Sequence, residues 1–402
     1  MSFQPPKGTD DIIAPGSQAW RETLRLWEEW SERYGYPLFQ TPIFEATELF
    51  ERGVGDTSEV VTKQMYTFED RGGRSVTLRP EATAGVVRAY LNSGHQGAWK
   101  GATSGPFFRY ERPQAGRRRQ FWQLDAEYLD TASPTADVEV IELGYRFIGA
   151  TGLPDVALLL NSIGDPVCRP IYVEELRTFL RARESELTAD SVNLIDRNPL
   201  RVLDSKVDAP QLIDAPRTLD YLCEPCAEHF ASVKQGLETL GIRYKEDTSL
   251  VRGLDYYTRT AFEYVATGLD TAQNAVGGGG RYDGLAEAIG GRPTPGVGFA
   301  LGLDRIMLAL GQPKRPYLDA YLVSETGPED ALGVVSTLRN EGIRVDFDVD
   351  GRSVKAQFRS AARLEAPVVL VWKGEGRPVD VQAEGERTEL PIREVSGWFT
   401  SR

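Results

Sequence analysis

Arginine, carboxylate and amide side chains occur in several segments of this sequence that alternate like strands. They are Glu81, Arg109, Glu111, Gln123, Glu127, Arg252 and Arg305. None of these side chains makes a strong nucleophile. Phosphoryl and nucleotidyl transfer depends chiefly on positioning and on charge neutralisation. The set is therefore suited to holding a polyanion in line with a carboxylate.

The residues for other common reactions are missing. The four glycines at 277–280 are not followed by Lys-Ser or Lys-Thr, so they do not form a nucleotide-binding P-loop, and they indicate a tight turn or a close backbone approach. No GxGxxG motif lies between a strand and a helix with the acidic residue that nicotinamide binding needs. With only His95 and His229 in the chain and no GxSxG, a Ser-His or Cys-His pair is not predicted either.

Cysteine usage gives no sign of a disulfide framework, because Cys168, Cys223 and Cys226 are few and odd in number. Cys223 and Cys226 have the CxxC spacing of a zinc knuckle, but a ribbon site needs a second such pair or two histidines. Only His229 is near in sequence, and Cys168 is remote. We expect ordinary thiols on a helix and no tightly bound, protein-ligated metal.

Positive charge is concentrated in "FFRYERPQAGRRRQFWQLDAEY", residues 107–128, although the formal net charge of the chain is -13. The basic residues are Arg109, Arg112, Arg117, Arg118 and Arg119. Local density of this kind can bind phosphate within an otherwise repelling surface. The alternative is a solvated charged loop.

Length and composition indicate two or three folded domains, since the chain has 402 residues of which 41% are hydrophobic. No segment approaches the ~18 uninterrupted apolar residues of a membrane span. The first residues, "MSFQPPKGTDDIIAPG", lack the basic and apolar regions of a signal peptide. We expect a cytoplasmic protein with no membrane contact.

The elements that must position these side chains can be read from periodicity. Residues 17–34 predict an amphipathic helix with Ser17 as its N-cap, and residues 36–50 a strand stopped by Pro42. A turn at Gly72–Gly73, a strand through Leu78 and a helix from about Pro80 come next. Residues 79–81 therefore lie at a strand-to-helix junction, where side chains can face a cleft.

Residues 107–128 predict a hairpin whose loop is "RPQAGRRR". In its second strand Gln123, Asp125 and Glu127 alternate with apolar residues, so they share one face. A helix is predicted over about 135–150, followed by the strand "DVALLLN".

The rest of the chain changes character twice. Residues 166–245 have helical periodicity and predict an insertion. Strand-like alternation resumes at 250–266, and "AVGGGGRYDGLAEAIGG" predicts a glycine-rich turn into a helix. Residues 294–311 predict a strand running into a helix. After the linker "GQPKRP", short strands alternate with helices, which is typical of a small α/β module with a partly parallel sheet.

Five ordered motifs resemble a known family. "TPIFEATELF", the 107–128 hairpin and "GVGFALGLDRI" resemble motifs 1, 2 and 3 of class II aminoacyl-tRNA synthetases. "TLRPEATAG" and "VRGLDYYTRTAFEY" resemble the histidine-site signatures of the histidyl-tRNA synthetase family. The resemblance covers nearly the whole chain, including "NPLRVLDSK" and "GRSVKAQFRSAARL".

The resemblance implies an α+β fold, with a class II catalytic domain over residues 1–313 and a C-terminal α/β anticodon-binding domain over 314–402. The first domain would hold a roughly six-stranded antiparallel sheet flanked by helices, with the helical insertion at about 166–245. The implied activity forms histidyl-adenylate from histidine and ATP with Mg²⁺ and transfers histidine to tRNA(His). Motif 1 would help to form a homodimer.

The resemblance also implies individual roles. Arg109 would hold the α-phosphate, Glu111 the adenine amino group and Arg305 the γ-phosphate. Arg252 would touch the histidine carboxylate and the α-phosphate, so Arg252 and Arg109 would be catalytic. The implied histidine-binding residues are Glu81, Ala82, Thr83, Arg109, Gln123, Glu127, Arg252, Tyr256, Tyr257 and Tyr282. The hairpin residues for the tRNA acceptor end are Arg112, Gln114, Arg117, Arg118 and Arg119.

Within this set, Glu81, Thr83 and Gln123 would take the α-ammonium, and Glu127 and Tyr257 the imidazole, with Tyr282 as a further candidate for it. Structural ion pairs are the alternative for the arginines, and core packing for the tyrosines. Two segments depart from the family's pattern. The family often has a cysteine followed by fewer glycines where this chain has "AVGGGG", and "VWKGEGRPVDVQ" lacks the family's acidic pattern. A non-catalytic regulatory subunit of ATP phosphoribosyltransferase shares this core and is the second interpretation; a ligase for proline or threonine is the third.

Overall fold

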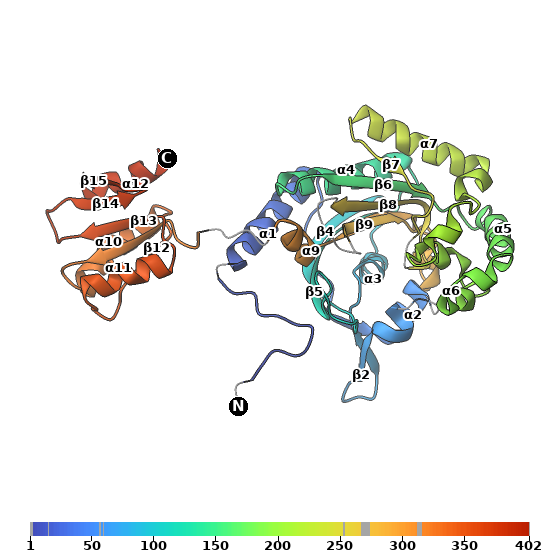
Figure 1. Ribbon diagram of the computed structural model, residues 1–402, viewed down its shortest axis with the longest axis horizontal. Helices are drawn as coiled ribbons and strands as arrows, with labels where there is room; N and C mark the ends of the chain where they lie inside the picture. Colours follow the sequence, from blue (N-terminus) through green and yellow to red (C-terminus); the bar gives the residue numbers. More distant parts are fainter. Residues whose placement is uncertain are drawn as a thin grey trace. The chain divides into compact units, whose positions relative to one another are not determined.

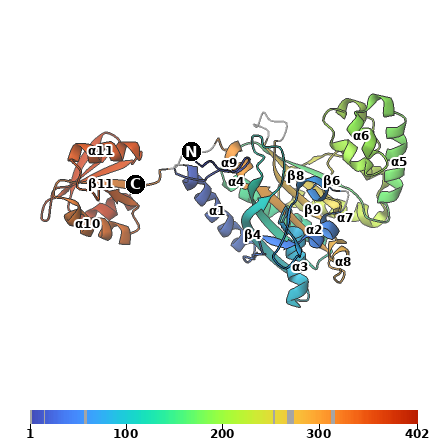
Figure 2. The ribbon, with the colours of Figure 1, turned by 90° about the horizontal axis from the view of Figure 1, so that it is seen from below.

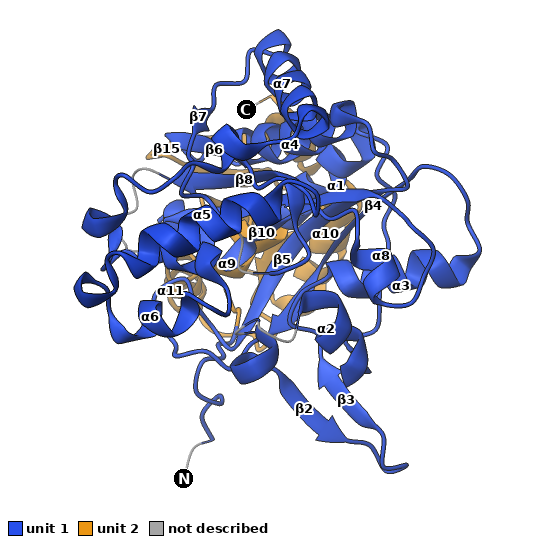
Figure 3. Cartoon of the chain, turned by 90° about the vertical axis from the view of Figure 1, so that its right-hand side faces the viewer, with its two compact units in different colours: residues 1–11, 22–312 blue, residues 12–21, 313–402 orange. Residues whose placement is uncertain are grey.

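The structure is a computed structural model that describes residues 3–14, 16–55, 58, 60–251, 254–266, 274–311 and 316–401. The chain forms two compact units, one of residues 1–11 and 22–312 and one of residues 12–21 and 313–402 (Figure 3). Unit 1 holds the sheet with the candidate functional residues. Unit 2 is a smaller α/β body.

A seven-stranded sheet is the framework of unit 1, in the order β4-β5-β10-β9-β8-β6-β7 (Figure 1). Neighbouring strands are antiparallel, except for the parallel pair β6 and β7. The strands are β4 Trp99–Phe108, β5 Gln120–Leu129, β6 Val156–Ser162, β7 Lys245–Glu246, β8 Thr258–Ala266, β9 Ala275–Arg281 and β10 Gly296–Gly302. The antiparallel sheet implied by the resemblance is confirmed.

Helices cover both faces of this sheet. On the outer face lies α4 (Pro134–Ala150), with α7 (Glu224–Thr239) against it (Figure 1). The predicted helix at the start of the chain is α1 (Gly16–Arg33), which places Trp27 edge-on against Phe147 and Phe299 in the core. The inner face carries α3 (Thr83–Ser93), which contacts α2 (Thr47–Val54) and α8 (Leu285–Ala288).

The glycine run at 277–280 is in the middle of strand β9, and the prediction of a turn there is wrong. A Cβ at Gly277 would lie 2.5 Å from the Ala300 carbonyl oxygen, and one at Gly280 would lie 2.5 Å from the Thr260 carbonyl oxygen. Neighbouring strands approach so closely that side chains do not fit. The other expectation for this run, a close backbone approach, describes it correctly.

Three predicted boundaries also differ. The strand β1 (Phe44–Ala46) begins after Pro42 instead of ending there, and it joins β3 (Ser75–Leu78) and β2 (Tyr66–Glu69) in a small sheet ordered β1-β3-β2. Helix α1 begins at Gly16, so Ser17 is inside its first turn. Helix α3 begins at Thr83, because Pro80 to Ala82 form the junction from β3.

The predicted insertion contains a separate group of helices. It consists of α5 (Arg169–Arg181), α6 (Ala189–Leu194) and four short 3₁₀ segments, Glu184–Glu186, Pro199–Asp204, Ala209–Leu212 and Thr218–Tyr221 (Figure 2). Its own core is formed by Tyr172, Leu176, Leu180, Ile195 and Val202. The last helix of the predicted span, α7, packs on α4 instead, so it belongs with the main sheet.

Unit 2 has a five-stranded sheet in the order β12-β11-β13-β14-β15. Its first three strands are parallel and the last two pairings are antiparallel, as the predicted partly parallel sheet requires. Its elements are β11 Ala320–Ser324, α10 Pro328–Asn340, β12 Val345–Phe347, α11 Val354–Arg363, β13 Val368–Trp372, β14 Val379–Ala383, β15 Glu386–Leu390 and α12 Ile392–Thr400. In the part of the chain that the structure describes, no helix is long and apolar enough to cross a membrane.

A buried ion pair joins β9 to α4. The Arg281 side chain is fully buried, and its Nε donates to both Asp137 carboxylate oxygens at 3.3 and 3.1 Å. Arg281 also donates to the carbonyl oxygens of Thr131 and Ser133, and His229 Nε2 lies 3.2 Å from Asp137 Oδ1. Breaking a buried pair is costly because the remaining charge stays out of water.

We therefore expect Asp137→Ala to lower the free energy of unfolding by about 3–5 kcal/mol, because it leaves Arg281 buried without its main anion. The measurement is urea unfolding followed by circular dichroism. Asp283→Ala is the control, since Asp283 also pairs with Arg281 at 3.0 Å but is partly exposed, and its loss should cost less than about 1 kcal/mol. Equal losses in the two variants would contradict the role of burial.

Candidate active site

A pocket opens on the inner face of the sheet, between the β4–β5 hairpin, the start of α3 and the residues before β8. Predicted site residues that line it are Glu81, Ala82, Thr83, Arg109, Glu111, Arg117, Arg118, Gln123, Tyr256, Tyr257 and Arg305. Segments far apart in the sequence thus meet at one place. The sheet brings them together because β5 and β10 are adjacent and β8 lies one strand beyond β9.

Guanidinium groups gather at one end of the pocket. Arg109 Nε donates to the Pro80 carbonyl oxygen at 2.9 Å, and Arg117 Nε lies 3.3 Å from Glu111 Oε2. Arg305 of α9 (Leu303–Ala309) is held by the carbonyl oxygens of Gly116 and Ala275. Burial lowers the pKa of Arg305, and the charges of Arg117 and Arg109 lower it further. This end of the pocket therefore favours a multiply charged anion.

Carboxyl groups occupy the other end, where α3 starts. Glu81 accepts the backbone N–H groups of Thr83 at 2.8 Å and of Ala84 at 2.9 Å, so its side chain caps α3. Glu127 accepts the Thr83 hydroxyl at 2.8 Å and the Tyr282 hydroxyl on its other oxygen. Glu127 and Tyr282 form a buried layer beneath the lining residues, and both are about 1% exposed.

These carboxyls are difficult to ionise without a ligand. Burial raises the pKa of Glu127 to about 8, although the hydroxyls of Tyr282 and Thr83 oppose the shift. Burial also raises the pKa of Asp125 well above its usual range, with the charge of Glu127 adding to the effect. The pKa of Glu81 is raised by burial as well. A ligand that carries positive charge or N–H donors would stabilise the ionised forms.

Two buried acceptors at this end have no hydrogen-bond partner among the described residues, Gln123 Oε1 and Asp125 Oδ2. Both residues line the pocket. Such atoms are costly unless a water or ligand satisfies them. Tyr256 packs against Tyr257 with ring centroids 4.6 Å apart and against Tyr282 at 5.7 Å, so aromatic rings border the same space.

The basic loop divides into exposed and tethered residues. Arg112 and Gln114 are exposed. Arg118 pairs with Asp10 at 2.7 Å and with Asp304 at 3.5 Å, and the Arg119 guanidinium lies 3.8 Å from the centre of the Tyr110 ring. Of the predicted acceptor-end set, the structure thus leaves Arg112 and Gln114 facing solvent and ties the triple arginine into the protein.

Arg252, which is predicted to be catalytic, lies outside the described residues. Other residues of the pocket were not predicted. Asp125, Glu263 and Asp304 line the pocket without having been predicted as site residues. Strand alternation already placed Asp125 on one face with Gln123 and Glu127, so the signal was present for it. Asp304, which accepts the Trp122 backbone N–H at 2.8 Å, had no such signal.

Known proteins are similar in sequence to this chain over nearly its full length. The profile of the family described as "Histidyl-tRNA synthetase" matches residues 8–306, and that of the "Anticodon binding domain" matches residues 321–373. A histidine–tRNA ligase of Halothermothrix orenii is 46% identical over 92% of this chain and 91% of its own length. One of Geobacillus kaustophilus is 43% identical over 100% of this chain and 99% of its own.

A solved structure agrees with these sequence matches. The apo histidyl-tRNA synthetase of S. aureus superposes with a TM-score of 0.77, is 34% identical, and covers 99% of this chain and 100% of its own. The matched family profile spans well over half of the chain, and it includes every strand of the main sheet and the pocket residues. This chain belongs to the histidyl-tRNA synthetase family.

Proposed function

We propose that this protein is a histidine–tRNA ligase, which activates histidine with ATP and transfers it to tRNA. One observation supports this beyond the family: the pocket has two unlike ends. Buried acceptors, among them Gln123 Oε1 and Asp125 Oδ2, suit an amino acid's ammonium and N–H groups. Arg109, Arg117 and Arg305 suit a triphosphate.

The activation step needs an aligned pair of substrates and no general base, because the histidine carboxylate is already ionised. A carboxylate oxygen attacks the α-phosphorus, the bond to the bridging oxygen breaks, and pyrophosphate leaves with its electron pair. In the second step a ribose hydroxyl of tRNA attacks the histidyl carbonyl, AMP leaves with the electron pair of the broken C–O bond, and the hydroxyl proton passes to AMP or to solvent. Arg109 is proposed to hold the α-phosphate, Glu111 the adenine amino group and Arg305 the γ-phosphate.

The proposed histidine contacts lie at the other end of the pocket, where the carboxyl groups are. Glu81, Thr83 and Gln123 would receive the α-ammonium, with Ala82 beside them. Glu127 and Tyr257 would address the imidazole, Tyr256 would border it, and Tyr282 would hold Glu127 in place through its hydroxyl. Arg252 would span the histidine carboxylate and the α-phosphate, because its planar fork can neutralise oxygens on both reactants.

We further propose that Mg²⁺ accompanies the ATP phosphates, which it neutralises and orients. Glu111 and Glu263 also line the pocket, and theirs are the carboxylates that would face the ion. We also propose a cytoplasmic homodimer that uses the motif 1 region, and a tRNA(His) contact by residues 314–402. For the acceptor end, the exposed Arg112 and Gln114 are the proposed contacts, with Arg117, Arg118 and Arg119 supporting the loop.

A non-catalytic regulatory role is the alternative. A Bacillus halodurans protein described as an ATP phosphoribosyltransferase regulatory subunit/histidyl-tRNA synthetase superposes with a TM-score of 0.68, but at 20% identity this shows the fold alone. The relatives at 42–46% identity are histidine–tRNA ligases over nearly their whole length. Histidine-dependent exchange of pyrophosphate into ATP by the purified protein tests the choice: exchange supports the ligase, and histidine binding without exchange supports the regulator.

Glu127→Gln tests the imidazole contact. The variant keeps a similar shape but loses the ionisable acceptor, so we expect the histidine KM in pyrophosphate exchange to rise by about 10- to 100-fold while the ATP KM stays within about twofold. The wild-type histidine KM should also fall as pH rises toward about 8, where Glu127 ionises, and this part of the pH dependence should vanish in the variant.

The same variant should be more stable at alkaline pH. Because the folded pKa of Glu127 is raised from 4.5 to about 8, its favourable contribution is complete below about pH 4.5 and is lost as pH rises to about 8. At pH 8.5 the free energy of unfolding of Glu127→Gln should exceed that of the wild type by up to about 5 kcal/mol, and at pH 4.5 the two should differ little. A stability difference that does not depend on pH would contradict the buried carboxyl, whatever the kinetics show.

Arg112→Ala tests the acceptor-end contact. Loss of one phosphate contact should weaken tRNA binding and lower the slope of log affinity against log salt by roughly 0.7 to 0.9. Pyrophosphate exchange should be unchanged, since Arg112 does not line the pocket. Arg25→Ala is the matched control, because Arg25 is an exposed arginine on α1. An unchanged salt slope for Arg112→Ala would exclude the contact.

Arg252→Ala tests the chemical step. Removing a donor that stabilises transition-state charge costs a factor of about 10² to 10³ in rate. We expect that loss in the kcat of pyrophosphate exchange, with a smaller change in histidine KM and an unchanged melting temperature. Arg243→Ala, which removes an exposed arginine before β7, serves as the control. A lowered melting temperature with activity lost in proportion would instead make Arg252 a structural ion-pair partner.

A further inference from the structure

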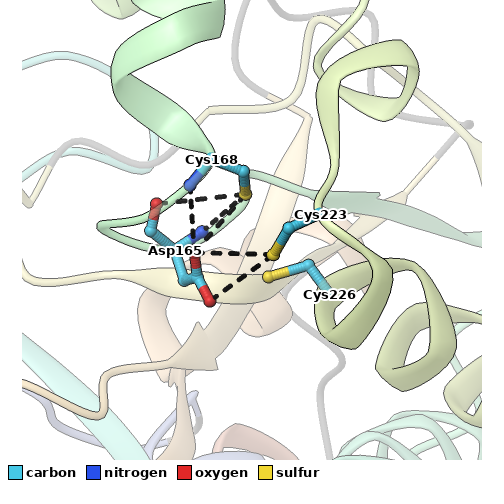
Figure 4. Close-up of side chains that lie close together, drawn as sticks. All are labelled: Asp165, Cys168, Cys223 and Cys226. Atoms are coloured by element: carbon cyan, nitrogen blue, oxygen red, sulfur yellow. Dashed lines mark hydrogen bonds between the residues drawn. The ribbon is translucent and has the colours of Figure 1, made fainter.

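Four potential metal ligands meet where the helical insertion joins the main sheet. Asp165 and Cys168 lie in the loop between β6 and α5, at the start of the insertion. Cys223 and Cys226 lie at the start of α7, where the chain returns. Figure 4 shows the four side chains converging from these two segments. Cys168, which is remote from the other cysteines in sequence, is thus next to them in space.

The two segments have the same ligand spacing. "DPVC" places a carboxylate and a thiol three positions apart, and "CEPC" does the same for two thiols. This is the spacing of the paired knuckles in zinc ribbons, with an aspartate in place of one cysteine. The nearby histidine does not compete for the site, since His229 Nε2 is occupied with Asp137.

The separations between the ligand atoms fit one tetrahedral ion. Cys168 Sγ lies 3.5 Å from Asp165 Oδ1, and Cys223 Sγ lies 3.9 Å from each Asp165 carboxylate oxygen. The four ligand atoms are all within 4.8 Å of one another. A zinc ion at 2.3 Å from sulfur and about 2.0 Å from oxygen would separate its ligands by about 3.5–3.8 Å. Small side-chain adjustments therefore complete the site.

The backbone around the ligands is built for close approach. Gly164 has a φ of +66°, and a Cβ there would lie 2.8 Å from Cys168 Sγ. The Arg259 N–H donates to the Gly164 carbonyl oxygen at 2.7 Å, and Arg259 carries a positive φ of 52° at an irregularity in β8. Asp165 Oδ1 also accepts the backbone N–H groups of Val167 and Cys168. These contacts fix the first knuckle to the sheet.

We propose that Asp165, Cys168, Cys223 and Cys226 bind one zinc ion that clips the two ends of the insertion together. Three sulfur ligands favour a soft or borderline cation, and a closed tetrahedral set is typical of a structural zinc site rather than a catalytic one. On binding, zinc displaces the three thiol protons, which pass to solvent. The proposal replaces the expectation of ordinary thiols and no protein-ligated metal.

The position of the clip gives it a structural role. It joins residues 168 and 223, so the 3₁₀ segments and helices between them form a closed loop that the ion fastens to the main sheet. The next residue, Arg169, donates to the carbonyl oxygens of Ile163, Gly164 and Tyr257, the last at 2.6 Å. The zinc knuckle therefore also supports the backbone of Tyr257, which lines the pocket.

The experiment is metal analysis of the full-length protein purified under reducing conditions. We expect one zinc ion per chain by elemental analysis, retained through dialysis without chelator. Co²⁺ added to the metal-free protein should give the visible absorption of a tetrahedral thiolate site. Cys226→Ser and Asp165→Asn should each weaken zinc binding by at least about 100-fold in a chelator competition, since even outer partners of metal ligands cost 10–100-fold.

Asp214→Asn is the matched control, because it removes an exposed carboxylate of the insertion that is not part of the cluster, and it should bind zinc like wild type. The cobalt spectrum of the wild type keeps the test valid if a cysteine variant fails to fold. No zinc and no tetrahedral cobalt spectrum with all three thiols reduced would overturn the proposal. So would a mass two protons lower under non-reducing conditions with no metal bound, which would indicate a Cys-Cys redox pair instead.

Discussion

The structure depends on the cost of burying charge in one pocket. On the inner face of the sheet, Asp125 and Glu127 are about 1% exposed and Glu81 about 4%, while guanidinium groups occupy the other end. Burial raises the pKa of each of these carboxyls, so each is harder to ionise in the pocket than it would be in water. In the proposed function, a dipolar amino acid would satisfy the carboxyl end and a nucleoside triphosphate would satisfy the guanidinium end. Substrate binding can thus recover free energy that folding gave up.

The ionisable groups around the pocket are held by hydrogen bonds from neighbouring residues. Both Glu127 oxygens are held by hydroxyl groups, both Glu81 oxygens cap α3, and Arg305 is fixed by two carbonyl oxygens. A charged side chain that could rotate into solvent would be stabilised by water instead of by a ligand. Groups that neighbours hold in this way need little reorganisation when a ligand binds.

Local patterns predicted the hairpin of β4 and β5, whereas the α+β class and the set of residues that meet in the pocket were implied by the resemblance of five ordered motifs to a known family. Gln123 and Glu127 share a face through simple alternation. The glycines of β9 were misread as a turn, because what they avoid is the backbone of strands that pair with them from elsewhere in the chain. Glycine content is visible in a sequence, but the neighbour that would clash with a Cβ is not. The tethering of Arg118 by Asp10 and Asp304 is hidden for the same reason.

The cysteine cluster shows the same limit in a different form. A search for cysteine and histidine spacing finds only "CEPC", since the other pair includes an aspartate and lies before a long helical segment. The fold removes that separation by returning the chain to its starting point at α7. The two ends of the insertion then meet one residue away from Arg169, whose guanidinium reaches the Tyr257 carbonyl oxygen. Arg169 therefore links the fastening of the insertion to the backbone of Tyr257, and Asn198 adds a second link by donating to Asp255, which precedes Tyr256.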